Sequence, residues 1–235
     1  MEIRFPGPED LKPMGELWQE AFGDDPAYIR DFFRHAFEPE RALVLGEPGR
    51  PLAMLFWLPG KWDGRPLGYL YAVAVRRDCR GRGLGSRILQ RAFSVMEEQG
   101  LAGALLVPGE PGLTSFYAGL GFSPCCPMED VSMEPEEVPR RPLSAGEYEA
   151  LREAYLRPGD AVLTGAALSL LSARGGLWET ERGLAAGTET LLMESWGQVR
   201  GPWRLRRRPG GEPFAMFRPL RAGATAPERF CMALD

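Results

Sequence analysis

A strand that ends at Val75, a glycine-rich loop and a long helix follow one another directly, and this unit constrains the fold more than any other. The residues from Tyr69 to Val75 are rich in aromatic and β-branched types, which favour a strand. From Gly83 to Gln99 apolar residues recur at helical spacing, and Gly100 ends the run. This order directs the N–H groups of the loop and the positive end of the helix dipole to one place. We therefore expect an anion-binding site at the loop.

The loop itself reads Arg80-Gly-Arg-Gly-Leu-Gly85, which places an arginine and two glycines at R-x-x-G-x-G spacing. The spacing alone is weak, because a chain of this composition contains roughly 0.4 chance matches. Its position between strand and helix strengthens it, and glycines let an anion approach the backbone. The loop has no lysine for a Walker P-loop, and its glycines miss the G-x-G-x-x-G spacing of a Rossmann loop. The pattern therefore predicts a pyrophosphate or a similar anion.

Composition excludes several classes of protein. The net charge of −4 argues against a general nucleic-acid binder. The longest apolar stretches, such as Leu52 to Leu58, are too short to cross a bilayer, and the N-terminus lacks a signal-peptide pattern. The four cysteines have no C-x-x-C spacing, which argues against a zinc site. His35 is the only histidine, and the sequence contains no G-x-S-x-G motif that would supply a catalytic serine. We expect a soluble cytoplasmic protein without a metal site, a disulfide framework or a catalytic triad, and with no nucleic-acid or membrane partner.

The first half of the chain alternates helices and strands. Apolar residues at helical spacing predict helices at 8–22 and 25–37, and another short helix at 113–120. Aromatic and β-branched runs between glycine and proline turns predict strands. The expected strands lie at 2–5, 42–46, 52–57, 67–75 and 104–107, with a further one starting near 121. We expect an α/β (α+β) fold with a mixed, mostly antiparallel sheet flanked by helices.

Prolines are frequent after Phe122, and an acidic patch follows at 134–137. We place a domain boundary near 135–143, which gives a first domain at 1–138 and a smaller second domain at 144–235. The second domain is expected to contain helices at 144–156 and 160–173 and no recognisable catalytic motif. Its short strands are expected at 177–180, 190–194, 203–207, 214–217 and 230–234.

Two motifs together resemble the GNAT superfamily of N-acetyltransferases. The acyl-CoA loop of that family reads R/Q-x-x-G-x-G/A after an aromatic, β-branched strand, as residues 69–86 do here. Ser115-Phe-Tyr-Ala-Gly-Leu-Gly-Phe122, which follows the strand at 104–107, is similar to the family's final strand–helix unit. The resemblance implies a strand that pairs with the pantetheine arm of acetyl-CoA and a loop that holds its pyrophosphate. The residues that it assigns to acetyl-CoA are Val73, Ala74, Val75, Arg80, Gly81, Arg82, Gly83, Leu84, Gly85 and Ser86.

Other stretches resemble a narrower group, the bacterial tandem-GNAT proteins related to the enhanced-intracellular-survival acetyltransferases. They are residues 17–24 with Phe32 and Phe33, and the tail at 213–219 and 232–235. In that group a degenerate GNAT-like half follows the active half, so the resemblance implies such a half at 144–235. It also implies that the C-terminal carboxylate, on Asp235 here, reaches the active half and acts as a base. An ordinary edge strand that closes the second half is the alternative.

Acetyl transfer to an amine needs a polarised thioester carbonyl, a base for the amine proton and an acid for the thiolate. A backbone N–H near Val75 can polarise the carbonyl. The resemblance favours Tyr117 as the acid over a role as a core aromatic, and Tyr69 and Tyr71 are further candidates. No base stands out besides the C-terminus. Candidates for an amine pocket, and equally for surface acids and core residues, are Asp24, Asp25, Trp57 and Trp62.

The function predicted is an acetyl-CoA-dependent N-acyltransferase, acting on groups other than amino-acyl. It is expected to move the acetyl group to a primary amine of a small molecule or peptide. Direct transfer in a ternary complex is favoured over a ping-pong route because nothing near Cys79 resembles an activating base. A non-catalytic acyl-CoA-binding regulatory protein is the alternative. The protein is expected to be bacterial, and a monomer or homodimer.

Overall fold

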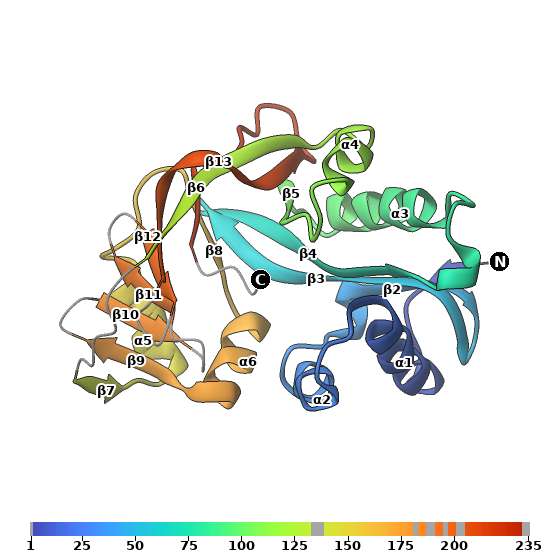
Figure 1. Cartoon of the computed structure of the whole chain (residues 1–235), viewed down its shortest axis with the longest axis horizontal. Coiled ribbons are helices and arrows are strands. Elements are labelled where there is room, and N and C mark those ends of the chain that lie inside the picture. The colour runs from blue at the N-terminus through green and yellow to red at the C-terminus, as the bar shows by residue number, and fades with distance from the viewer. Residues whose placement is uncertain are drawn as a thin grey trace.

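A computed structural model describes residues 2–132, 139–180, 183–186, 191–194, 197–200 and 205–231. These residues form one mixed, mostly antiparallel sheet that is flanked by helices, which confirms the predicted fold class (Figure 1). The strands of the first half are β1 (Ile3–Arg4), β2 (Ala42–Glu47), β3 (Arg50–Trp62), β4 (Arg65–Val75), β5 (Gly103–Leu106) and β6 (Ser123–Ser132). Its helices are α1 (Leu11–Phe22), α2 (Pro26–His35), α3 (Leu84–Glu98) and α4 (Leu113–Ala118), with short 3₁₀ turns at Pro8–Asp10, Pro39–Arg41 and Arg77–Cys79.

Strand β3 separates two cores, because successive side chains of a strand point to opposite faces. Met54 and Phe56 pack on the face that α1 and α2 cover. Leu55 and Trp57 pack on the other face, against the apolar side of α3. Figure 1 shows α1 and α2 on one side of the central strands and α3 on the other. The sheet is therefore covered on both faces at the point where the glycine-rich loop leaves it.

Local signals set the ends of the first two helices. Helix α1 ends at Gly23, whose φ of 72° is the left-handed conformation that favours glycine at this position. Asp25 caps α2 by accepting a hydrogen bond from the Ala27 N–H at 2.8 Å, and Pro26 fills the first helical position. The helices predicted at 8–22, 25–37 and 113–120 and the strands predicted before Phe122 are confirmed, with ends shifted by a few residues.

The second half of the chain adds strands and a small core of its own. Its helices are α5 (Ala145–Arg152) and α6 (Ala166–Gly175). Its strands are β7 (Arg140–Pro142), β8 (Asp160–Leu163), β9 (Leu177–Thr180), β10 (Gly183–Ala186), β11 (Leu191–Glu194), β12 (Gly197–Arg200), β13 (Leu205–Pro219) and β14 (Arg229–Cys231). Tyr148 of α5, Leu168 of α6 and Leu184 of β10 pack together in this core.

Residues 160–163 correct one prediction, since they form strand β8 and not the start of a helix. A short apolar run cannot be assigned to a helix or a strand by periodicity alone. Tertiary contacts decide here: β8 pairs with β3 on one side and with β14 on the other. Arg229 of β14 also binds the carboxylate of Asp160 with two hydrogen bonds of 2.5 Å. The helix predicted for this region begins only at Ala166.

Strand β13 connects the two halves of the chain in one sheet. Its residues Met216–Pro219 pair with β5, and Leu205–Phe217 pair with β6. The last strand of the N-terminal sheet therefore comes from a segment about 90 residues after β6 begins. The division into domains at 138 and 144 stays a prediction, and the sheet continues across it.

The first two prolines after Phe122, Pro124 and Pro127, lie inside strand β6, where the sequence predicts a break. Pro124 is opposite Met216 of β13, and Pro127 is opposite Pro213. Among the described residues β6 pairs with β13 alone, so its other edge does not need the N–H groups that proline lacks. Residues 133–138, which include the first part of the predicted boundary near 135–143, lie outside the described residues, and the later part of that boundary contains β7. No helix in the described part of the chain is both long and apolar enough to cross a bilayer.

Candidate active site

Strands β4 and β5 pair over only three residues and then separate. Leu67–Tyr69 lies parallel to Gly103–Leu105, after which β4 continues as far as Val75. A bulge follows in β4, where Ala72 has a φ of 47° and the register with β3 shifts. Bulges bend a strand and re-aim its backbone. The backbone at 72–75 therefore diverges from β5, at the place where the family resemblance predicts the pantetheine arm.

The glycines of the loop have conformations that suit an anion site. Gly81 and Gly83 have φ values of 74° and 73°, and a Cβ on either would meet no atom within 4 Å. Gly83 is the N-cap of α3, and no side chain caps this end of the helix. The first amides of the 15-residue helix α3 therefore have no side-chain cap. Such N–H groups, together with the helix dipole, favour a bound phosphate.

The arginines around the loop have different partners. The Nε of Arg80 donates to the carbonyl oxygen of Val75 at 3.1 Å, which ties the loop to the end of β4. Arg76 binds the carboxylate of Asp78 at 2.6 and 3.0 Å, and this contact lowers the pKa of Asp78. Arg82 donates to the carbonyl oxygen of Asp78 at 3.1 Å. The first of these contacts shapes the loop, and the second holds an acidic side chain to a neighbouring arginine.

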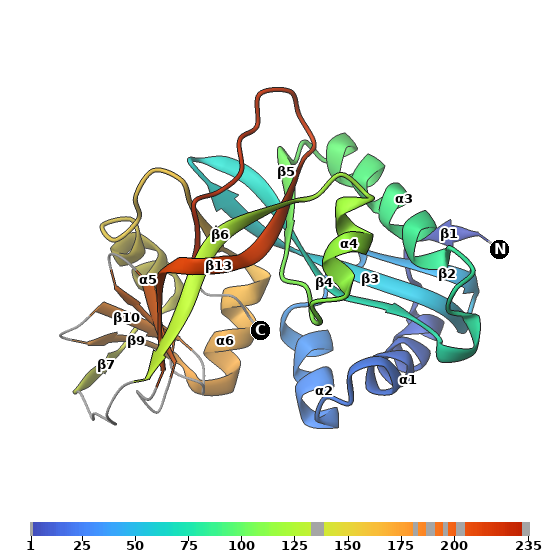
Figure 2. The same cartoon turned by 45° about the horizontal axis from the view of Figure 1, so that its top comes forward.

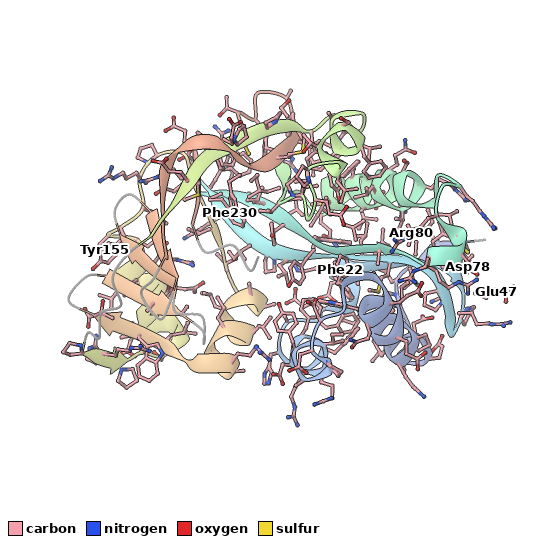
Figure 3. All side chains as sticks on the ribbon, in the orientation of Figure 1. Phe22, Glu47, Asp78, Arg80, Tyr155 and Phe230 are labelled. Atoms are coloured by element: carbon pink, nitrogen blue, oxygen red, sulfur yellow. The ribbon has the colours of Figure 1, made fainter. Side chains whose placement is uncertain are left out.

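A cavity of about 720 Å³ lies between the loop, β4 and α4. It is lined by every residue that the resemblance assigns to acetyl-CoA except Arg82. Cys79, Leu113 and Phe116 are among the other residues of its wall. Figure 2 shows α4 beside the strands on the side of α3, and Figure 3 shows Arg80 on the loop before α3. The predicted cofactor residues thus share one cavity, and their roles in binding stay predictions.

A second cavity, of about 510 Å³, lies on the side of α1 and α2. Its wall includes Trp18 and Asp24, the strand residues Tyr69 and Tyr71, and Tyr28 of α2. The two cavities have five lining residues in common: Phe22, Val73, Gly109, Leu113 and Tyr117. Because they share these residues, a group held in one cavity can meet a group held in the other.

Tyr117 of α4 is at the junction of the two cavities. Its side chain is 8% exposed, and its ring contacts Phe116 and Phe122 at centroid distances of 5.1 and 5.8 Å. Burial raises the pKa of Tyr117 to about 12 because it disfavours the phenolate. The phenol therefore keeps its proton at neutral pH and can donate it.

Of the four residues predicted as candidates for the amine pocket, only Asp24 lines the second cavity. Asp24 lines the second cavity, whereas Asp25 caps α2. Trp57 donates to the Oε1 of Gln99 at 3.2 Å within the core, and Trp62 packs against Phe217 at 5.2 Å. Tyr69 and Tyr71, the alternative acids, line the second cavity. Asp235 lies outside the described residues, so its predicted role stays a prediction.

Sequence reasoning missed three residues of the second cavity. Tyr28 and Trp18 follow the helical periodicity of α1 and α2, which assigns them only to a buried face. Phe22 lies at the end of α1 near the central strands (Figure 3). It is 49% exposed and lines both cavities. An exposed aromatic side chain at a helix end is a usable signal, but only once the fold is known. Within the described ranges no group of three or more metal-ligating side chains occurs.

The model of the family described as an acetyltransferase (GNAT) domain matches residues 2–125, more than half of the chain. The chain belongs to the GNAT acetyltransferase family. No curated protein matches it by sequence. The family match covers the strand–loop–helix unit, α4 and every described residue that lines either cavity.

Solved structures of acetyltransferases share the fold. A putative acetyltransferase from Pyrococcus horikoshii has a TM-score of 0.67 at 11% identity, covering 98% of this chain and 93% of that one. A GCN5-related N-acetyltransferase from Kribbella flavida has a TM-score of 0.60 at 17% identity, covering 85% and 55%. Eis1 from Mycobacterium abscessus has a TM-score of 0.57 at 14% identity, covering 79% and 53%. The chain spans just over half the length of the last two, and the tandem arrangement stays a prediction.

Proposed function

We propose that this protein is an N-acetyltransferase that moves an acetyl group from acetyl-CoA to a primary amine by direct transfer in a ternary complex. The observation that carries the proposal is the junction of two cavities at Val73 and Tyr117. One cavity has the glycine-rich loop, and the other has an acidic and aromatic wall. Two substrates that enter from opposite sides would bring their reacting atoms together at this junction.

The larger cavity fits acetyl-CoA. The amides at the start of α3 and the open space over Gly81 and Gly83 suit the pyrophosphate. The backbone at 73–75 can pair with the amides of the pantetheine arm, because it diverges from β5. Arg80 and Ser86 add polar groups to the same wall. Family membership supports the same assignment.

The transfer proceeds by attack of a neutral amine nitrogen on the thioester carbonyl. A backbone N–H near Val75 stabilises the oxyanion that forms. The C–S bond then breaks, the C–N bond remains, and the sulfur accepts a proton while the nitrogen loses one. Tyr117 donates toward the sulfur. Since its pKa of about 12 lies above the ordinary thiol value near 8.5, complete proton transfer requires that the phenolate be reprotonated.

The test is thiol release from acetyl-CoA in the presence of amines, with mass spectrometry of the acetylated product. The proposal expects amine-dependent release that Tyr117→Phe lowers and that requires an intact loop. Binding of acetyl-CoA without release for any amine would favour the alternative, a non-catalytic acyl-CoA-binding regulatory protein. Absence of acetyl-CoA binding would contradict both.

Several features of the proposal rest on the sequence alone. They are the C-terminal carboxylate of Asp235 as base, the acceptor as a small molecule or peptide, the monomeric or homodimeric state and the bacterial cytoplasm. The assignment to acyltransferases that transfer groups other than amino-acyl groups also rests on the sequence alone. Reaction without a metal also stays a prediction.

A further inference from the structure

The second cavity is unusually aromatic, and its composition narrows the class of amine that it suits. This inference rests on the proposed function, since it concerns the acceptor of the same site. Six aromatic side chains line the cavity: Trp18, Phe22, Tyr28, Tyr69, Tyr71 and Tyr117. Among the described residues no lysine or arginine lines it, and Asp24 is the one carboxylate in its wall.

The rings form a continuous surface centred on Trp18. Its ring centroid lies 5.6 Å from that of Tyr71, 6.3 Å from that of Tyr28 and 6.4 Å from that of Phe22. Tyr69 continues this surface at 6.0 Å from Tyr71. The hydroxyls of Tyr28 and Tyr71 form a hydrogen bond with each other at 2.6 Å, which fixes the orientation of both rings. Such a wall offers ring faces to an apolar or aromatic body and also attracts cations.

Asp24 supplies a single negative charge at this wall. Its Oδ2 accepts a hydrogen bond from the Nε1 of Trp18 at 2.7 Å, so the carboxylate has a fixed position beside the central ring. A cation contacts the outer side of this wall: the guanidinium of Arg174 of α6 lies 4.9 Å from the Tyr28 ring centroid. Arg174 is itself paired with Asp31 at 2.7 Å and does not line the cavity. The described part of the cavity wall therefore offers one carboxylate to compensate an ammonium group.

We propose that the acceptor is an amine with one positive charge on an aromatic body, such as an arylalkylamine. Asp24 attracts its ammonium group, and the rings around Trp18 hold its body. A polyamine or another polycation would find only one carboxylate among the described lining residues, so its further ammonium groups would be buried without an opposite charge there, which is unfavourable. A neutral molecule of the same shape would gain the ring contacts but not the attraction of Asp24.

Calorimetry with three probes tests this inference without requiring turnover. The probes are 2-phenylethylamine, which has both features, 2-phenylethanol, which lacks the charge, and butane-1,4-diamine, which lacks the ring. The amine should bind at least tenfold more tightly than either of the others. Asp24→Asn retains an oxygen acceptor for Trp18 and should weaken 2-phenylethylamine at least fivefold, while 2-phenylethanol is unaffected.

Asp25→Asn is the matched control, because Asp25 is the adjacent carboxylate but caps α2 and does not line the cavity. It should leave the affinity for 2-phenylethylamine unchanged. Equal affinity for the diamine or the alcohol, or an Asp24→Asn variant with wild-type affinity, would overturn the inference. Thiol release with acetyl-CoA is measured separately. Faster release with the diamine overturns the inference and keeps the proposed function, whereas Asp24-dependent binding without any release supports the assigned ligand class and contradicts the proposed function.

Discussion

A negative charge at Gly83 should weaken acetyl-CoA binding more than an equally large neutral side chain. Gly83 is the exposed N-cap of α3, and a Cβ there meets no atom within 4 Å, so the space for a side chain exists. Its φ of 73° makes any L side chain unfavourable by about 1 to 2 kcal/mol. Gly83→Glu and Gly83→Gln share this strain and almost the same volume. The difference between them therefore measures charge.

The expected size of that difference follows from the position of the loop. A carboxylate about 6 Å from a phosphate charge repels it by about 0.7 kcal/mol in water and by about 3 kcal/mol at an effective dielectric constant of 20. Because the loop is exposed, we expect a value between these limits, about 1.4 kcal/mol, which is a tenfold weaker binding of acetyl-CoA by the Glu variant than by the Gln variant.

Isothermal calorimetry at low and high salt measures this difference, with circular dichroism to confirm that both variants are folded. The gap should narrow as salt screens the charge. Equal affinities of two folded variants at low salt would show that no phosphate lies near the first turn of α3. The assignment of the larger cavity to acetyl-CoA would then be wrong.

Three further predictions concern other parts of the molecule. Tyr117→Phe should lower kcat between about 10²- and 10⁴-fold and leave the affinity for acetyl-CoA within twofold, as steady-state kinetics and calorimetry can show; an unchanged kcat would assign the proton to water or another group. Asp10 is buried and accepts hydrogen bonds from Arg4 and from the Gly7 and Gly49 N–H groups, and the Arg4 contact first of all lowers its pKa from 3.8 to about 2. Because the pKa of Asp10 is lower in the folded protein than in the unfolded chain, the ionised carboxylate stabilises the fold by about 2 kcal/mol above pH 3.8, and this stabilisation is lost as the pH falls toward 2. In urea titrations, Asp10→Asn should therefore lower the free energy of unfolding at pH 7 but not near pH 2. Two glycines appended after Asp235 should lower kcat/KM if the terminal carboxylate attracts or deprotonates the amine, and full kcat/KM at normal stability would exclude that role.

The acetyl-CoA side of the site could be predicted from sequence because its determinants are local. Strand β4, the loop at 81–85 and α3 are adjacent in the chain, and glycine and helical spacing identify them directly. The bulge at Ala72 could not be predicted, since a non-glycine residue with a φ of 47° has no sequence signature here. The same holds for β8, whose strand conformation depends on pairing with β3 and β14. Local propensity gave way to tertiary pairing there.

The acceptor side depends on contacts between residues that are far apart in the chain. Tyr28 is on α2, and α2 is held by Arg174 of α6, which binds Asp31 and lies over the Tyr28 ring. These partners are separated by more than 140 positions, so no local pattern links them. Strand β13 adds a second connection of the same kind, because it enters the sheet beside β5. Since α6 and β13 follow residue 139, the second half of the chain supports the geometry of a cavity whose described lining residues lie in the first half.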